Sequence, residues 1–294
     1  SLISIKDNYA IFSHPDYPNI GPAFIAGFSK LIGYWNEVFP KVALTLIYLP
    51  ALIILNKYFN KNDFFLVLAF VFFTTGKFIV NGEMDGLVAI YFTLSVLTIY
   101  NLIIVKEENF IIYATPALLI IILSLLKMEG FVLSMILLSV TTLILIYKKK
   151  INQKFIFTFI IALIPAFIWQ LFTVTIDISN ANTPYNYNVE KFSERIMNIK
   201  DYLLITKYLI LNEKFLISIF FYIFAYLLTK NKNIFLYGLS IILIYTTTLY
   251  IVYLSTPLDI EWHLDSSATR VVKPMALFLF VFGMYNINNK NKIY

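Results

Sequence analysis

The stretch Leu87–Val105, LVAIYFTLSVLTIYNLIIV, is the clearest structural signal in this chain. It contains no charged residue and is close to the ~20 residues that a helix needs to cross a bilayer. Lys106, Glu107 and Glu108 follow it directly, so the charges begin where the apolar run ends. This pattern predicts a transmembrane helix over Leu87–Val105.

Apolar runs of this kind recur along most of the chain. Its 294 residues are 60% hydrophobic and 14% charged, whereas a soluble domain is roughly half apolar and a quarter charged. Because the runs are continuous and not alternating, they predict helices rather than β-barrel strands. We therefore expect a single all-α, polytopic transmembrane domain over residues 1–294 with about nine spans. The expected spans are Val38–Tyr58, Phe64–Val80, Leu87–Val105, Phe110–Leu126, Phe131–Tyr147, Phe155–Ile176, Phe215–Leu228, Ile234–Leu254 and Val271–Ile287.

Two other segments are expected to lie along the membrane surface. Ile20–Trp35 is short, semi-apolar and glycine-containing. Further along the chain, Phe192, Ile196, Ile199 and Leu203 recur at helical spacing, which is typical of an amphipathic interfacial helix.

The lysines predict the orientation of the spans. The net charge of +6 resides largely in short loops between apolar runs, so we interpret it as a topology signal and not as nucleic-acid binding. With nine spans, all of these loops can be cytoplasmic, which places residues 1–37 outside and the C-terminus inside. An external start without a signal peptide leads us to expect a further helix before Ser1. The loops concerned hold Lys57 and Lys61, Lys106, Lys148–Lys150, Lys230 and Lys232, and Lys290 and Lys292.

This topology collects the reactive side chains on one side of the membrane. Both histidines of the chain and many of its carboxylates fall in the expected external loops, whereas the cytoplasmic loops hold mainly lysine and asparagine. Any chemistry is therefore expected at the outer surface. The external set is His14, Asp16, Glu83, Asp85, Lys127, Glu129, Glu261, His263, Asp265, Ser266, Ser267 and Arg270.

Most of these residues also have a simpler structural interpretation. His14 and Asp16 sit in a turn made rigid by two prolines. Asp85 is placed to complement a helix dipole. Lys127 and Glu129 fit an exposed turn between two helices.

The segment Glu261–Arg270 is harder to explain as structure alone. It combines acid, imidazole, hydroxyl and guanidinium groups in the expected loop Ser255–Arg270, directly before the ninth span. Arg270 and Lys273 are three residues apart and therefore share one face of a helix. Such a pair at the membrane surface suits a phosphate or pyrophosphate group.

Four motifs in order give the chain a resemblance to a known family. They are His14-Pro-Asp-Tyr-Pro18, Asn81-Gly-Glu-Met-Asp-Gly86, Lys127-Met-Glu-Gly130 and Trp262-His-Leu followed by Ser267 and Arg270. This order resembles bacterial membrane glycosyltransferases of the GT-C superfamily, related to protein mannosyltransferases and lipid A aminoarabinose transferases. The resemblance implies transfer of a hexosyl or pentosyl group from a polyprenyl-phosphate donor to a glycan, lipid or protein acceptor. It also implies a bacterial inner membrane and a site on its outer face.

The resemblance further implies roles for individual residues. Such enzymes carry a catalytic acid after their first transmembrane helix, and we expect that helix and the start of its loop to precede Ser1. Asp16 is then the candidate base, or assists that acid, with His14, Glu83 and Asp85 beside it in the catalytic set. The expected substrate- and phosphate-binding residues are Lys127, Glu129, His263, Ser267, Arg270 and Lys273.

Cofactor and lipid requirements follow from the same interpretation. No spacing demands a cofactor, although His14, Glu83, Asp85 and His263 could supply ligands to a divalent metal. The lipid tail is expected in a groove between helices, near Ile20–Trp35 and Phe192–Leu211.

Three alternatives remain open. A transporter or flippase of lipid-linked substrates predicts ionisable residues at mid-membrane depth, whereas the charges here cluster at the ends of the spans. A non-catalytic membrane subunit leaves the gathering of both histidines on one face unexplained. An O-antigen ligase or polymerase shares the substrate and the outer face, and only the motif order favours the transferase over it.

Overall fold

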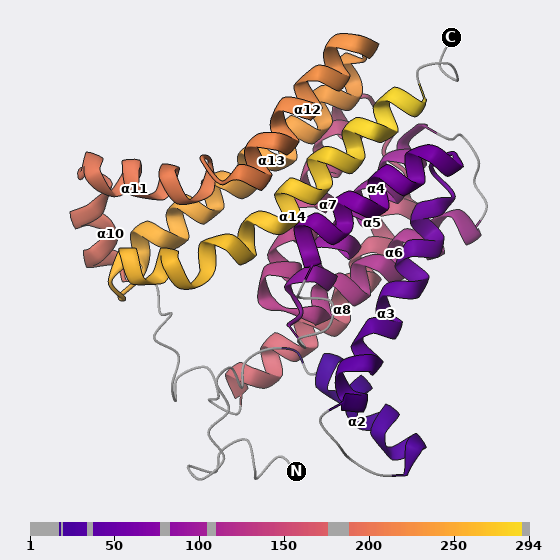
Figure 1. Ribbon diagram of the computed structural model, residues 1–294, viewed down its shortest axis with the longest axis horizontal. Helices are drawn as coiled ribbons and strands as arrows, with labels where there is room; N and C mark the ends of the chain where they lie inside the picture. The colour runs from indigo at the N-terminus through magenta and orange to yellow at the C-terminus, as the bar shows by residue number, and fades with distance from the viewer. Residues whose placement is uncertain are drawn as a thin grey trace.

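The computed structural model describes residues 18, 20–33, 38–76, 83–104, 110–175 and 188–289. Within these ranges every regular element is a helix and no strand is present, which confirms the all-α prediction (Figure 1). The helices are α2 (Ile20–Ile32), α3 (Val38–Asn56), α4 (Lys61–Thr75), α5 (Asp85–Ile104), α6 (Phe110–Leu126), α7 (Met128–Tyr147), α8 (Gln153–Thr175), α10 (Val189–Ile196), α11 (Ile199–Leu209), α12 (Glu213–Thr229), α13 (Lys232–Ser255) and α14 (Ile260–Asn288).

Helix α5, which contains the opening apolar stretch, lies at the centre of the core. Its residues are buried from Asp85 to Leu102 with the single exception of Asn101. Helices α3, α4, α6, α7 and α14 all pack against it. A helix that is apolar on every side is stable where other helices or lipid cover it. In α5 the apolar surface is covered by the other helices of the protein.

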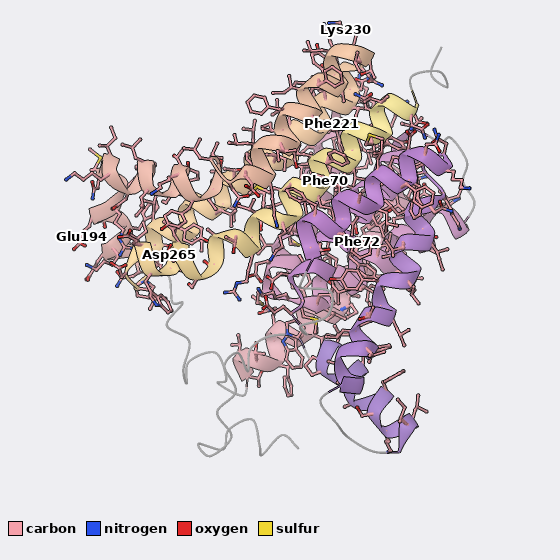
Figure 2. The ribbon with its side chains drawn as sticks, viewed as in Figure 1. Phe70, Phe72, Glu194, Phe221, Lys230 and Asp265 are labelled. Atoms are coloured by element: carbon pink, nitrogen blue, oxygen red, sulfur yellow. The ribbon has the colours of Figure 1, made fainter. Side chains whose placement is uncertain are left out.

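Helix α14 joins α5 to the second half of the chain. It packs most extensively against α12 and next against α5, and Figure 1 shows it as the long yellow helix between them. The ring of Phe280 on α14 stacks between Phe70 of α4, at 3.9 Å, and Phe221 of α12, at 4.5 Å between centroids. Figure 2 shows Phe70 and Phe221 on the two helices that flank α14. Aromatic stacking therefore joins three helices in one layer.

Five described helices are long and apolar enough to cross a membrane: α5, α7, α8, α13 and α14. A sixth span results if α11 and α12, which meet at an angle of 76°, are counted as one. The other predicted spans coincide with α3, α4 and α6. Helix α8 exposes large apolar side chains, including Phe157, Ile168 and Leu171, as a lipid-facing helix does. These features are consistent with a membrane protein.

The structure corrects the prediction of a loop over Ser255–Arg270. Helix α14 begins at Ile260, because Asp259 caps it and accepts a hydrogen bond from the Trp262 amide at 2.9 Å. The functional candidates His263 and Arg270 therefore lie on a helix and not in a loop.

The predicted surface helix over Phe192–Leu211 is also divided. It is two helices, α10 and α11, and the break falls where Asn198 caps α11 by accepting a hydrogen bond from the Lys200 amide at 3.1 Å. A cap in mid-segment starts a second helix instead of continuing the first.

The close approach of α6 and α7 depends on Gly130. A Cβ atom at this position would lie 2.1 Å from the Leu123 carbonyl oxygen, a backbone atom that cannot rotate away. We expect Gly130→Ala to lower the free energy of unfolding by about 1–3 kcal/mol through overpacking. The measurement is the midpoint of thermal unfolding in detergent, followed by intrinsic fluorescence.

Gly27→Ala in α2 is the matched control. A Cβ there meets nothing within 4 Å, and alanine is the better helix former, so its midpoint should be unchanged or slightly higher. Equal midpoints for wild type and Gly130→Ala would contradict the described approach of the two helices.

Candidate functional site

A buried ammonium group bridges two carboxylates at the N-terminal ends of α5 and α7. Lys127 Nζ lies 2.9 Å from Asp85 Oδ1 and 2.9 Å from Glu129 Oε1. The side chains of Lys127 and Asp85 are each 8% exposed, and that of Glu129 is 27% exposed. Asp85 is the first residue of α5, while Lys127 immediately precedes α7 and Glu129 lies in its first turn. Residues far apart in the sequence thus form one charged unit, the Lys127 bridge.

The two carboxylates keep Lys127 charged. Burial lowers the pKa of Lys127, but the charges of Glu129 and Asp85 and their hydrogen bonds outweigh burial and raise this pKa overall. An ammonium group held in this way stabilises its partners only while all three are present, because removal of one leaves a buried charge uncompensated. The sequence interpretation of Lys127 and Glu129 as an exposed turn is therefore wrong for Lys127.

A second group of candidates lies on one face of α14. His263, Ser267 and Arg270 follow one another at intervals of about one helical turn and therefore share this face. The hydroxyl of Tyr253, on α13, lies 2.8 Å from Ser267 Oγ, and its ring packs edge-on against the His263 ring with centroids 4.9 Å apart. Tyr253 thus holds the polar face of α14 against the end of α13.

Helix packing places the Lys127 bridge beside α14, because α5 packs against α14 and α7 packs against α13. The charges of Glu129, Arg270 and Lys127 act on the buried hydroxyl of Tyr253. The sequence predicted these three residues but not Tyr253. Tyr253 is one of 21 tyrosines in the chain, and nothing in the sequence around it distinguishes it from the other tyrosines near the ends of spans.

The region also holds buried polar atoms that have no hydrogen-bond partner in the described part of the chain. Among them are Glu129 Oε2, an acceptor, Arg270 Nε, a donor, and the Tyr48 hydroxyl beside Gly86. Buried polar atoms in proteins are nearly always paired, and an exception calls for an explanation such as a ligand. A carboxylate oxygen can accept a hydrogen bond from a sugar hydroxyl, and a guanidinium group can donate to a phosphate oxygen.

Lys273 belongs to the same region but lies deeper among the packed helices. It lies one turn beyond Arg270 on α14 and is 2% exposed. The carboxylates of Asp85 and Glu83 are the acids whose charges act on it. The structure therefore brings Glu83, Asp85 and the α14 cations into one electrostatic environment.

The imidazole of His263 already has a structural partner. Its Nδ1 atom lies 3.0 Å from Thr256 Oγ1 in the α13–α14 turn. Arg195 of α10 fixes the same turn by donating hydrogen bonds to the carbonyl oxygens of Thr256, at 2.7 Å, and Leu258, at 3.0 Å. Arg195, which the sequence analysis did not single out, thereby positions the segment that carries His263.

Other sequence candidates lie elsewhere. His14 and Asp16 fall outside the described residues. Asp265 is exposed and accepts a hydrogen bond from the Tyr208 hydroxyl at 2.5 Å, and Figure 2 shows it toward the N-terminal end of α14. Among the residues that the structure describes, no three His, Cys, Asp or Glu side chains are grouped as metal ligands.

We expect Lys127→Met to lower the free energy of unfolding by about 3–5 kcal/mol, because it leaves Asp85 and Glu129 as buried carboxylates without a cation. Lys191→Gln is the control, since the Lys191–Glu194 pair has the same 2.9 Å length but side chains 43% and 63% exposed. Its loss should be at most about 1 kcal/mol. The unfolding midpoints of both variants, measured in detergent, test the difference, and similar losses would contradict the buried bridge.

Comparison with known proteins gave no relative: no protein-family model, curated protein or solved structure matches this chain.

Proposed function

We propose that this chain is a polytopic membrane glycosyltransferase that moves a sugar from a polyprenyl-phosphate donor to a glycan, lipid or protein acceptor. The observation that carries the proposal is the meeting of the Lys127 bridge with Arg270 and Lys273, where an unpartnered carboxylate oxygen and an unpartnered guanidinium nitrogen are both buried. Glycosyl transfer from a lipid phosphate needs these two kinds of group. The order of the sequence motifs supports the same class.

The proposed topology has about nine spans with the site on the outer face of a bacterial inner membrane. Support comes from the division of charge along the chain, in which the candidate acids and cations alternate with loops rich in lysine. Figure 2 shows Lys230 and Asp265 at opposite ends of the α12 and α14 pair, which supports placing their segments on opposite sides of the membrane. Helix α11 turns by 76° from α12, which suits a helix lying along the membrane surface.

The described contacts refine the proposed roles. Arg270 and Lys273 bind the phosphate, because they lie one turn apart on α14 and the buried Nε of Arg270 has no hydrogen-bond partner among the described residues. Lys127 orients Asp85 and Glu129 instead of binding phosphate. Glu129 accepts a hydrogen bond from a sugar or acceptor hydroxyl through Oε2.

The chemical step is a displacement at the anomeric carbon. The acceptor oxygen forms a bond to that carbon while the bond from the carbon to the phosphate oxygen breaks. The electron pair leaves with the lipid phosphate, where the cations of α14 stabilise it, and the acceptor proton passes to a carboxylate. Asp16, which falls outside the described residues, is the proposed base.

The lipid chain has a candidate site beside this centre. An open groove of about 410 Å³ lies between α10, α11 and α13, near the segment where a tail was expected. Its walls are mainly apolar, with tyrosine and threonine among them, which suits a prenyl chain. Its lining residues are Phe192, Ile196, Tyr202, Leu243, Thr246, Thr247, Tyr250, Ile251 and Leu254.

A transporter or flippase of lipid-linked substrates is the second candidate. The burial of Lys127 and Lys273 among the helices favours it, because ionisable groups inside a helical bundle often line a transport path. A flippase moves the lipid-linked sugar without breaking its bond to phosphate, so product analysis separates the two functions.

We expect membranes containing the chain, together with any segment that precedes Ser1, to transfer label from a radiolabelled polyprenyl-phosphate sugar. Arg270→Ala and Glu129→Gln should each slow transfer by about 10²–10³-fold, the usual cost of removing one transition-state hydrogen bond. Arg270→Lys should retain more activity than Arg270→Ala. Asp265→Asn is the control, because Asp265 is exposed and contacts Tyr208 instead of the site.

Transfer by wild type and by all of these variants would keep the enzyme class but refute the residue assignments. Movement of intact donor across the membrane, with no transfer to any acceptor, would instead support the flippase.

A further inference from the structure

Lys214 is a cation that the sequence analysis did not consider. It lies in the first turn of α12, and its Nζ atom is 3.4 Å from the carbonyl oxygen of Thr74, near the C-terminal end of α4. The same atom is 5.3 Å from the centre of the Phe73 ring. The ammonium group therefore sits where α4 and α12 meet.

A short series of contacts connects Lys214 to the Lys127 bridge. Thr75, which follows Thr74, lies so near Gly86 that a Cβ atom on this glycine would be 3.3 Å from the Thr75 Cβ. Gly86 directly follows Asp85, whose carboxylate binds Lys127. At the end of α4, Lys214 therefore lies beside Thr74, and the start of α5 lies beside Thr75.

Packing between α12 and α14 brings Lys214 near the other cations. These two helices make the most extensive contact in the described structure. Phe221 of α12 stacks on Phe280 of α14, and Lys214 and Lys273 each lie seven residues before these rings on their own helices. Lys214 therefore lies at the level of Lys273, and the charges of Lys214 and Arg270 both act on Lys273.

Several cations converge in this region, and they are Lys127, Lys214, Arg270 and Lys273. Lys127 is bound by the carboxylates of Asp85 and Glu129. A phosphate group carries negative charge and accepts hydrogen bonds from ammonium and guanidinium groups, so it suits such a region.

We propose that Lys214 is the third cation of the phosphate-binding set and contacts the phosphate of the lipid-linked substrate together with Arg270 and Lys273. This inference rests on the proposed function, since it assigns a further residue to the same site. An ammonium group has three donors, and in the described residues Lys214 uses one of them, in a long hydrogen bond to Thr74. Donors therefore remain for a phosphate oxygen.

A purely structural role for Lys214 is the competing explanation. The Thr74 carbonyl is among the last four of α4, and a cation beside such carbonyls stabilises a helix end. The two roles differ in what they predict for a ligand. Loss of a helix cap weakens binding of any ligand to the disturbed site, whereas loss of a phosphate ligand weakens binding only of molecules that carry phosphate.

The test measures binding of farnesyl phosphate and of farnesol, which has the same chain without the phosphate, to the full chain purified in detergent. We expect Lys214→Gln to weaken binding of farnesyl phosphate at least about tenfold, as loss of a charged hydrogen bond does, and to leave farnesol binding unchanged. Lys214→Arg, which keeps the charge, should restore most of the affinity. Lys207→Gln is the matched control, because Lys207 also lies over an aromatic ring, at 5.9 Å, but is exposed on α11.

Equal weakening for both ligands, or unchanged binding of farnesyl phosphate to Lys214→Gln, overturns the inference while leaving the proposed function intact. A wild-type chain that binds farnesyl phosphate no better than farnesol overturns it as well. Binding that depends on Lys214 in a chain that transfers no sugar supports the phosphate site and counts against the transferase. Loss of binding in Lys214→Gln with no rescue by Lys214→Arg assigns the residue to structure.

Discussion

The cost of burying charge governs how the helices of this chain meet. Lys127 is held between Asp85 and Glu129 in the interior, where an ion without partners would cost several kcal/mol. Both acids are followed by a glycine, and both glycines have neighbours too close for a side chain. A Cβ on Gly86 would meet the Tyr48 hydroxyl at 2.2 Å, and one on Gly130 would meet a backbone oxygen of α6. The acid–glycine pairs therefore bring the helix ends close enough for one ammonium group to reach both carboxylates.

Helix α14 extends this constraint across the molecule. Its 29 residues span about 43 Å at ~1.5 Å per residue, which exceeds the ~30 Å of a hydrocarbon core. From Val271 onward nearly every residue is buried, whereas the first turns expose polar side chains such as Glu261 and Asp265. Pro274 lies just inside the buried part, and because it lacks an N–H, the carbonyl of Arg270 receives no helical hydrogen bond from it. The guanidinium group thus sits at the change from a polar to an apolar helix surface.

The sequence predicts where the helices lie along the chain better than it predicts which helices contact one another. Apolar length alone recovered α6 at both of its ends, since Phe110–Leu126 is bounded by charges on either side. The early start of α14 was missed because its first turns are polar, although Asp259 before Ile260 is a recognisable capping signal. Tyr253 and Lys214 could not be found in this way. Their positions depend on contacts between helices distant in sequence, and periodicity carries no information on which helix ends will meet.

The position of α13 suits the proposed substrate, which has a charged head and a long tail. Leu254 lines the apolar groove, and the preceding residue, Tyr253, contacts Ser267 on the polar face of α14. Successive residues on a helix point in directions about 100° apart, so a single turn of α13 borders both environments. Arg195 holds the carbonyls at the end of this helix, and its own helix, α10, contributes Phe192 and Ile196 to the groove. A lipid chain entering the groove would therefore press on the element that fixes the turn before α14, and the orientation of His263 would depend on the tail as well as on the head group.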